Sequence, residues 1–249
     1  MQEIIIDIHK VSKTYRGNDN PAVSNFSIQV VQGEFFGLLG PNGAGKSTLL
    51  NILSGLLPFD TGNITICGWD LLRQINIIKP LIGVVPQDIA LYPSLTAMEN
   101  LKVFGGLYSI NKKELIPRID ELLDYFGLTP HKNRRIKTYS GGMKRRINLI
   151  AGLLHRPKVL FLDEPTVSVD VQSKALILTN LKEINAQGTT IIYTSHFMDE
   201  AESLCSRVAF IDEGKLLCSG KPNDLIQDSD CENLESLYLK LTGKSLRDE

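Results

Sequence analysis

The sequence contains no long hydrophobic run and no obvious leader segment. Apolar stretches such as Val159–Leu162 fall far short of the roughly 18 to 20 residues that a helix needs to cross a bilayer. The first residues, Met1–Lys10, lack the basic region followed by an apolar region that marks a secretory signal. We therefore expect no membrane span and no secretion, and any role at a membrane is expected to need a partner.

An excess of one charge is also missing, as is any cluster of cysteines. The 27 basic and 28 acidic residues give a net charge of -1 and are interspersed, so the sequence predicts no nucleic-acid-binding face. The four cysteines show no spacing typical of a metal site; they are Cys67, Cys205, Cys218 and Cys231. We interpret them as reduced thiols of a cytoplasmic protein, with a disulfide or a metal site as the alternative.

Strands and helices alternate along most of the chain. With 249 residues, 43% of them hydrophobic, the chain can bury one sizeable core, with or without a smaller lobe. Hydrophobic patterns predict strands at residues 4–8, 22–30, 34–39, 63–66, 82–85, 159–162 and 189–193, with a short pair within 208–217. Helical patterns cover residues 47–56, 141–154 and 173–187, and the tail is amphipathic. This alternation indicates a mostly parallel, covered sheet, whereas Phe26, Ile28 and Val30 indicate a half-buried antiparallel strand.

The character of the sequence changes between about Gln87 and Arg135. Residues 97–108 and 112–126 alternate charged and apolar residues with helical spacing, and β-branched runs are nearly absent. We interpret this part as a helical lobe inserted into the α/β core.

A glycine-rich loop follows the apolar strand at 34–39 and leads into a helix. It reads Gly40-Pro41-Asn42-Gly43-Ala44-Gly45-Lys46-Ser47, the spacing of a phosphate-binding loop. Glycines let the backbone fold closely around phosphates, so that its N–H groups form an anion-binding nest at a helix N-terminus. We expect Lys46 to contact the β- and γ-phosphates of a nucleotide and Ser47 to bind Mg²⁺. A plain glycine-rich turn would explain the bend but not the Lys-Ser pair.

Two acidic residues stand at the end of the apolar strand 159–162. Because parallel strands deliver their last residues to one edge of the sheet, we expect Asp163 and Glu164 at the edge that carries the phosphate loop. Asp163 is the candidate Mg²⁺ ligand, and Glu164 is the candidate general base that polarises the attacking water. The alternative is that both acids only carry the chain into solvent. His196 follows a further strand and is a candidate γ-phosphate contact, although a lone histidine after a strand is usually structural.

The segment Tyr139-Ser140-Gly141-Gly142-Met143 opens a helix shortly before Asp163. It resembles the Leu-Ser-Gly-Gly-Gln signature of the ATP-binding subunits of ABC transporters. A serine cap followed by bare backbone N–H groups forms a second anion site, although Ser-Gly-Gly alone is only a cap and a flexible turn. Two anion sites in one chain suggest that two copies meet head to tail. Ser140, Gly141 and Gly142 of one copy would then close over the ATP held by the other.

The resemblance covers essentially the whole chain and implies roles for further residues. It implies that Tyr15 stacks on adenine, that Thr48 also binds the nucleotide, and that Gln87 contacts Mg²⁺ and the attacking water. Asp170, in the loop after the acidic pair, is implied to act across the dimer. The chain departs from the family pattern at Met143, where a glutamine is usual, and at Ser168-Val169, where many members have Gly-Leu. These departures bear on how the two copies are coupled.

The family implies an α/β fold: a P-loop NTPase core with a mostly parallel sheet, an N-terminal antiparallel β subdomain and an inserted α-helical subdomain. A single ABC ATPase domain is expected over residues 1–249, with the helical subdomain at about 88–140 and a helical tail at about 220–249. Residues 92–100, 194–202 and 237–247 resemble the exporter branch, which handles antibiotics, sodium, polysaccharides and lipids.

We therefore expect an ATP-hydrolysing subunit, with ATP and Mg²⁺ as its cofactors, that powers export through a separate integral membrane permease. The subunit would lie at the inner face of the cell membrane. Residues 96–108 are the candidate surface for docking to the permease; alternatively, their apolar residues form part of the core of the helical lobe. The alternatives are the ATPase subunit of an importer, or a soluble ABC-type ATPase acting on nucleic acid or ribosomes.

Overall fold

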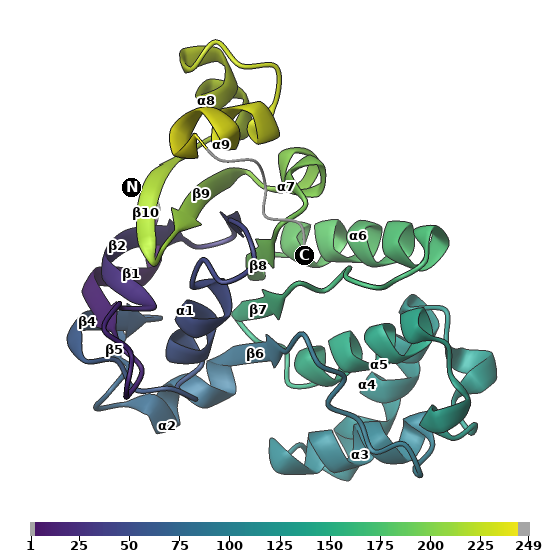
Figure 1. The fold of residues 1–249 in the computed structure, drawn as a ribbon. Helices are drawn as coiled ribbons and strands as arrows, with labels where there is room; N and C mark the ends of the chain where they lie inside the picture. Colours follow the sequence, from purple (N-terminus) through teal and green to yellow (C-terminus); the bar gives the residue numbers. More distant parts are fainter. Residues whose placement is uncertain (1–2, 244–249) are drawn as a thin grey trace. The chain divides into compact units, whose positions relative to one another are not determined.

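The computed structural model describes residues 3–243, which form two compact units. The first unit contains residues 3–79 and 190–243, and the second runs from Pro80 to Thr189; Figure 1 shows the elements of each. The end of the predicted tail, residues 244–249, lies outside the described residues. Within residues 3–243, none of the helices has the length and apolar character of a membrane span.

An antiparallel sheet forms in the first unit, in the order β2-β1-β4-β5. Its strands are β1 (Ile4–Lys13), β2 (Val23–Val31), β4 (Thr61–Ile66) and β5 (Trp69–Asp70). In β2 the alternating residues Phe26, Ile28 and Val30 are buried, as their spacing in the sequence predicts. The sheet confirms the predicted N-terminal antiparallel β subdomain.

The same unit contains further strands that are mostly parallel, and one of them, β3, leads into the phosphate loop. Strand β3 (Phe35–Leu39) pairs in parallel with β8 (Thr190–Ser195) and with β9 (Arg207–Asp212), and β10 (Lys215–Gly220) pairs antiparallel with β9. All residues of β3 are buried, because elements cover both faces of this strand. The helices of this unit are α1 (Lys46–Leu53), α2 (Ile75–Ile78), α7 (Met198–Leu204), α8 (Pro222–Asp228) and α9 (Leu234–Thr242).

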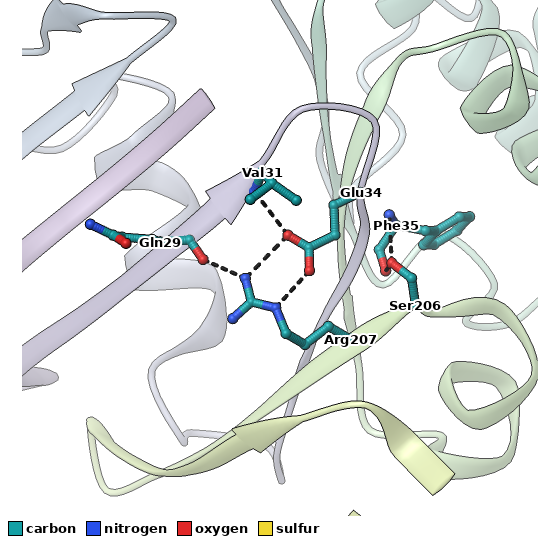
Figure 2. Close-up of polar contacts among 6 residues, drawn as sticks. All are labelled: Gln29, Val31, Glu34, Phe35, Ser206 and Arg207. Atoms are coloured by element: carbon teal, nitrogen blue, oxygen red, sulfur yellow. Dashed lines mark hydrogen bonds and ion pairs between the residues drawn. The ribbon is translucent and has the colours of Figure 1, made fainter. Parts of the chain in front are cut away.

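An ion pair between Arg207 and Glu34 joins the two sheets of the first unit at the strand ends farthest from the phosphate loop (Figure 2). Nε of Arg207 lies 2.6 Å from Oε1 of Glu34, whose side chain is only 7% exposed. The other carboxylate oxygen accepts a hydrogen bond of 2.9 Å from the N–H of Val31, and Arg207 also donates to the carbonyl of Gln29. The guanidinium lies over the ring of Phe36, 4.9 Å from its centroid. The cluster therefore ties β2 to β3 and β9.

The second unit is built on a pair of parallel strands and the helices that lie between and after them in the chain (Figure 1). Strand β6 (Ile82–Val85) pairs with β7 (Val159–Asp163). Between them in the chain lie α3 (Ala97–Leu107), α4 (Lys112–Tyr125) and α5 (Gly141–Leu153), and α6 (Val171–Ala186) follows β7. Short 3-10 turns occur at Lys79–Leu81, Thr129–His131 and Ile136–Thr138. These elements confirm the predicted α/β class with an inserted helical part.

Side-chain caps fix where the helices of the second unit begin. The hydroxyl oxygen of Thr96 accepts a hydrogen bond from the N–H of Glu99, and the Glu99 carboxylate accepts one from the N–H of Thr96. These two bonds form a complete capping box at the start of α3. At the starts of α4, α5 and α6, the side chains of Asn111, Ser140 and Asp170 each accept one hydrogen bond from a backbone N–H of the first turn. The starts of these helices are therefore set by local sequence.

Several details of the first unit differ from the sequence-based expectation; among them, β1 extends to Lys13, and the short elements α2 and β5 have no counterpart among the predicted ones. Helix α1 ends at Leu53 instead of residue 56, because Gly55 takes a left-handed φ of 72° and the chain turns there. Helix α7 was not predicted, because seven residues give too little periodicity to recognise a helix.

Candidate functional site

Three glycines shape the phosphate loop between β3 and α1. Gly43 and Gly45 have φ values of 79° and 106°, which residues with side chains rarely adopt. A Cβ on Gly40 would lie 2.1 Å from the carbonyl oxygen of Ile211, and a Cβ on Gly45 would lie 2.3 Å from that of Ala22. Gly43 and Gly45 are therefore required by the positive φ of the backbone, and Gly40 and Gly45 by the carbonyl oxygens that lie close to them.

Lys46 opens α1, and its side chain folds back over the loop. The residue is only 4% exposed, and Nζ donates to the carbonyl oxygens of Gly40 at 2.8 Å and Pro41 at 3.0 Å. A buried ammonium group is thus held within the loop at the positive end of the helix dipole, where an anion is favoured.

Two further predicted nucleotide contacts lie side by side near this loop. The hydroxyl of Tyr15 lies 3.2 Å from Oγ1 of Thr48, which is on the first turn of α1. The Tyr15 residue is 40% exposed, so its ring remains accessible for stacking on a planar group.

His196 leaves the same strand edge as the phosphate loop. Leu39 in β3 is in register with Ser195 in β8, so Gly40 and His196 are the next residues of neighbouring parallel strands. The N–H of Gly40 donates to the carbonyl of Ser195 at 3.4 Å. His196 is half-buried, and its ring centroid lies 4.1 Å from that of Phe197.

In the second unit, Gln87 and the acidic pair occupy one edge of the β6–β7 pair. Val85 is in register with Leu162, so the residues that follow the two strands leave the same edge. Asp163 and Glu164 are 8% and 5% exposed. Glu164 has a φ of 45°, a left-handed conformation that costs a non-glycine residue about 1–3 kcal/mol. The candidate base is therefore held in a conformation that its surroundings must enforce.

The signature segment packs against the loop that contains Asp170. Ser140 Oγ accepts a hydrogen bond of 3.2 Å from the N–H of Met143 at the start of α5. A Cβ on Gly142 would lie 2.3 Å from Oγ of Ser173 and 2.9 Å from Oδ2 of Asp170, so only glycine fits there. The backbone N–H and the hydroxyl of Ser173 hold the pKa of Asp170 below its ordinary value.

A hollow of about 290 Å³ lies in the second unit beside this helix start. Gln87, Gly141, Arg145 and Ser168 are among its lining residues. Ser168 has a left-handed φ of 59° at the position where many relatives are expected to carry glycine. The hollow thus borders both the signature and the residue implied to contact the attacking water.

Sequence reasoning missed Arg145, whose guanidinium donates to the carbonyl oxygens of Pro86 at 2.8 Å and Glu164 at 2.7 Å. The signal was available as the cationic run Lys144-Arg145-Arg146 inside a helix that is otherwise largely apolar. A cation that faces the interior must find acceptors, but the sequence does not say which ones.

The chemistry of these groups suits a nucleoside triphosphate with a divalent cation. The loop amides and Lys46 suit phosphate oxygens. A hydroxyl, such as that of Ser47 in the first unit, and a carboxylate, such as that of Asp163 in the second unit, are each a type of hard oxygen ligand that Mg²⁺ prefers. Glu164, a second buried carboxylate, suits a general base.

Comparison with known proteins gives the same assignment. A family described as ABC transporter matches residues 23–167, which is more than half of the chain. The linearmycin resistance ATP-binding protein of Bacillus subtilis is 47% identical over 89% of this chain and 70% of its own length. The Nod factor export ATP-binding protein I of Paraburkholderia xenovorans is 40% identical over 94% of this chain and 77% of its own length.

Among solved structures, an ATP-binding cassette in a dimeric post-hydrolysis state with bound ADP and phosphate superposes with a TM-score of 0.79. It is 27% identical, and the match covers 87% of this chain and 98% of that one. The predicted family and its use of ATP with Mg²⁺ are therefore confirmed: the chain belongs to the ABC transporter family and is an ATP-binding, ATP-hydrolysing subunit.

Proposed function

We propose that two copies of this chain close head to tail on ATP and power export through a separate membrane permease. The observation that carries the proposal is the second anion-binding element, the Ser140-capped start of α5, in the chain that also holds the phosphate loop. The dimeric neighbour with bound ADP and phosphate supports the pairing, and the relative named for Nod factor export supports the direction.

In this proposal each residue of the phosphate loop and of the strand ends has a chemical role. Backbone N–H groups within residues 42–48 and the ammonium of Lys46 bind the β- and γ-phosphates, and Tyr15 stacks on the base. Ser47 and Asp163 would hold Mg²⁺, which neutralises charge on the phosphates when bound. Gln87 orients a water molecule, and His196 contacts the γ-phosphate.

The reaction itself is an in-line attack of water on the γ-phosphorus. The carboxylate of Glu164 accepts the proton of the attacking water, and the bond between the γ-phosphorus and the β–γ bridging oxygen breaks. Closing of the second copy brings Ser140, Gly141 and Gly142 to the γ-phosphate, with Asp170 acting between the copies. Loss of phosphate removes negative charge from the interface, so the dimer opens again.

We propose that the exposed side of α3 is the docking surface for the permease, which places the chain at the inner face of the membrane. Ala97, Leu101 and Gly105 of this helix are buried, whereas Val103 and Leu107 are 39% and 74% exposed. The helix therefore contributes both to the lobe core and to the surface. Next to its last turn lies a hollow of about 880 Å³, which is lined in part by Tyr108 and His155.

The docking surface is tested by introducing a charge at its most exposed apolar residue. Leu107→Asp should abolish co-purification of the permease from detergent-solubilised membranes, because burying an unpaired carboxylate at the interface is unfavourable. ATP hydrolysis by the isolated chain should be unchanged. Leu56→Asp is the matched control, because Leu56 is 72% exposed and lies outside α3.

Three results would contradict the proposal. If the permease still co-purifies with the Leu107→Asp variant, the docking surface is wrong. Inward transport by the reconstituted complex would indicate an importer. ATP hydrolysis that depends on RNA, with no membrane partner, would indicate the soluble alternative.

A further inference from the structure

Arg145 is almost completely buried and connects two segments of the proposed catalytic machinery. It lies on the second turn of α5 and is 3% exposed. Nη2 donates to the carbonyl oxygen of Glu164 at 2.7 Å, and Nη1 donates to that of Pro86 at 2.8 Å. A buried guanidinium is costly unless its donors are used, and such charge-assisted bonds are stronger than neutral ones. Arg145 therefore fixes the peptide groups of both segments.

The first carbonyl belongs to the candidate general base. Glu164 has the left-handed φ of 45°, and its carbonyl oxygen also accepts from the N–H of Val167 at 3.3 Å. The direction of the Glu164 side chain depends on the orientation of this peptide group. A donor that holds the carbonyl therefore helps to set where the carboxylate points.

The second carbonyl is that of Pro86, directly before Gln87. The side chain of Asn148 also contacts the carbonyl of Asp88, directly after Gln87. Asn148 lies one turn after Arg145, is also 3% exposed, and has Nδ2 3.4 Å from the carbonyl oxygens of both Pro86 and Asp88. These contacts are long, so we expect Arg145 to contribute most of the restraint. Together, the two side chains hold the backbone on both sides of Gln87.

We infer that Arg145 is a positioning residue that makes the placement of Gln87 and Glu164 depend on the position of α5. The inference rests on the proposed roles of these two residues. The N-terminus of α5 carries Ser140 and Gly142, the proposed contacts to the ATP of the other copy. A shift of this helix on dimer closure is passed through Arg145 to the residues that orient and deprotonate water. Hydrolysis is thereby linked to closure.

The first test measures positioning without any need for activity. Amide hydrogen exchange is compared for wild type, Arg145→Met and the control variant Lys144→Met. Lys144 is the neighbouring cation on the same helix and is half-buried. Arg145→Met should speed exchange in peptides that cover residues 85–90 and 163–168 and leave β3 and α1 unchanged. Lys144→Met should match wild type in all of them. Unchanged exchange in both peptides of a folded Arg145→Met variant overturns the inference.

The second test separates binding from chemistry. Arg145→Met should lower kcat for ATP by about 100-fold, because a displaced base and water lose alignment, and should leave KM within about threefold. Arg145→Lys keeps the cation but cannot bridge two carbonyls in a fork, so it should fold and give an intermediate kcat. If Arg145→Met fails to fold, the Arg145→Lys variant decides: a wild-type kcat contradicts the inference. If wild type does not hydrolyse ATP at all, the proposed function fails, while the exchange comparison still decides the positioning.

Discussion

The ammonium group of Lys46 donates a hydrogen bond of 2.8 Å to the carbonyl oxygen of Gly40, the residue that begins the phosphate loop. The lysine therefore stabilises the loop from inside, and the phosphates of ATP offer the same cation stronger, charged acceptors. One side chain thus serves both loop geometry and nucleotide affinity.

Replacing this lysine should weaken nucleotide binding. Lys46→Ala removes a charge-assisted contact worth about 1.5–3 kcal/mol, so the Kd for ATP should rise by about 10- to 150-fold. Titration with a fluorescent ATP analogue measures the change, and a melting curve checks that the variant is folded. Lys221→Ala, at an exposed position outside the loop, should bind like wild type. An unchanged Kd for Lys46→Ala would contradict the assigned role.

The Glu34–Arg207 pair shown in Figure 2 should contribute strongly to stability. Arg207→Met leaves a buried carboxylate without its cation, and we expect the free energy of unfolding to fall by about 3 kcal/mol. The surface pair of Lys132 and Asp120 has side chains that are 34% and 45% exposed, so Lys132→Met should cost less than about 1 kcal/mol. Urea unfolding compares the two variants. Equal losses would show that burial does not set the strength of the first pair.

Ser168 should tolerate glycine and reject a β-branched residue. Its φ of 59° is strained for side chains, and most strongly for branched ones. Ser168→Gly should therefore unfold at or above the urea midpoint of wild type, whereas Ser168→Val should lose about 1–3 kcal/mol. If both variants unfold at the same midpoint, backbone strain does not explain the family preference for glycine.

The stability of the chain should depend on the charge of Asp170 at acidic pH. Hydrogen bonds from Ser173 hold the pKa of this carboxyl below its ordinary value, so the folded state favours the charged form. This stabilisation is fully present above the unfolded pKa of about 4 and is lost as the pH falls through the lower folded pKa. Asp170→Asn keeps a helix cap but does not titrate. Below about pH 4, wild type should lose more stability than this variant in urea unfolding, and parallel losses would contradict the assignment.

The elements that carry local signals could be predicted from the sequence. The phosphate loop follows an entirely buried strand, and the capped start of α5 is encoded by Ser140. Helix α6 begins at Val171, after the Asp170 cap, two residues before the predicted helix at 173–187. Strand register then brings residues from distant positions to common edges. Because each strand ends where its apolar run ends, the edge positions of Gly40 and His196 follow from the pattern.

Contacts between distant segments could not be predicted in the same way. The bonds of Arg145 reach across 59 positions to Pro86 and 19 positions to Glu164, and no periodicity specifies such partners. The left-handed conformation of Ser168 could not be predicted from the sequence either, because serine gives no local signal for a positive φ. Arg145 itself lies in α5, but its acceptors Pro86 and Glu164 lie in loops, as does Ser168, and the shape of these loops is set by tertiary packing.

The most direct test of the account is light scattering of Glu164→Gln with and without ATP. Without its carboxylate the variant cannot accept the proton of the attacking water, so it should bind ATP, show no turnover and accumulate as a stable dimer. Adding Lys46→Ala to the same variant should return it to monomer at an ATP concentration below the raised Kd, because less ATP is then bound to hold the two copies together. A doubling of the molar mass of Glu164→Gln on addition of ATP is the result that the account predicts. A monomeric mass under both conditions, with ATP shown to be bound, would contradict it.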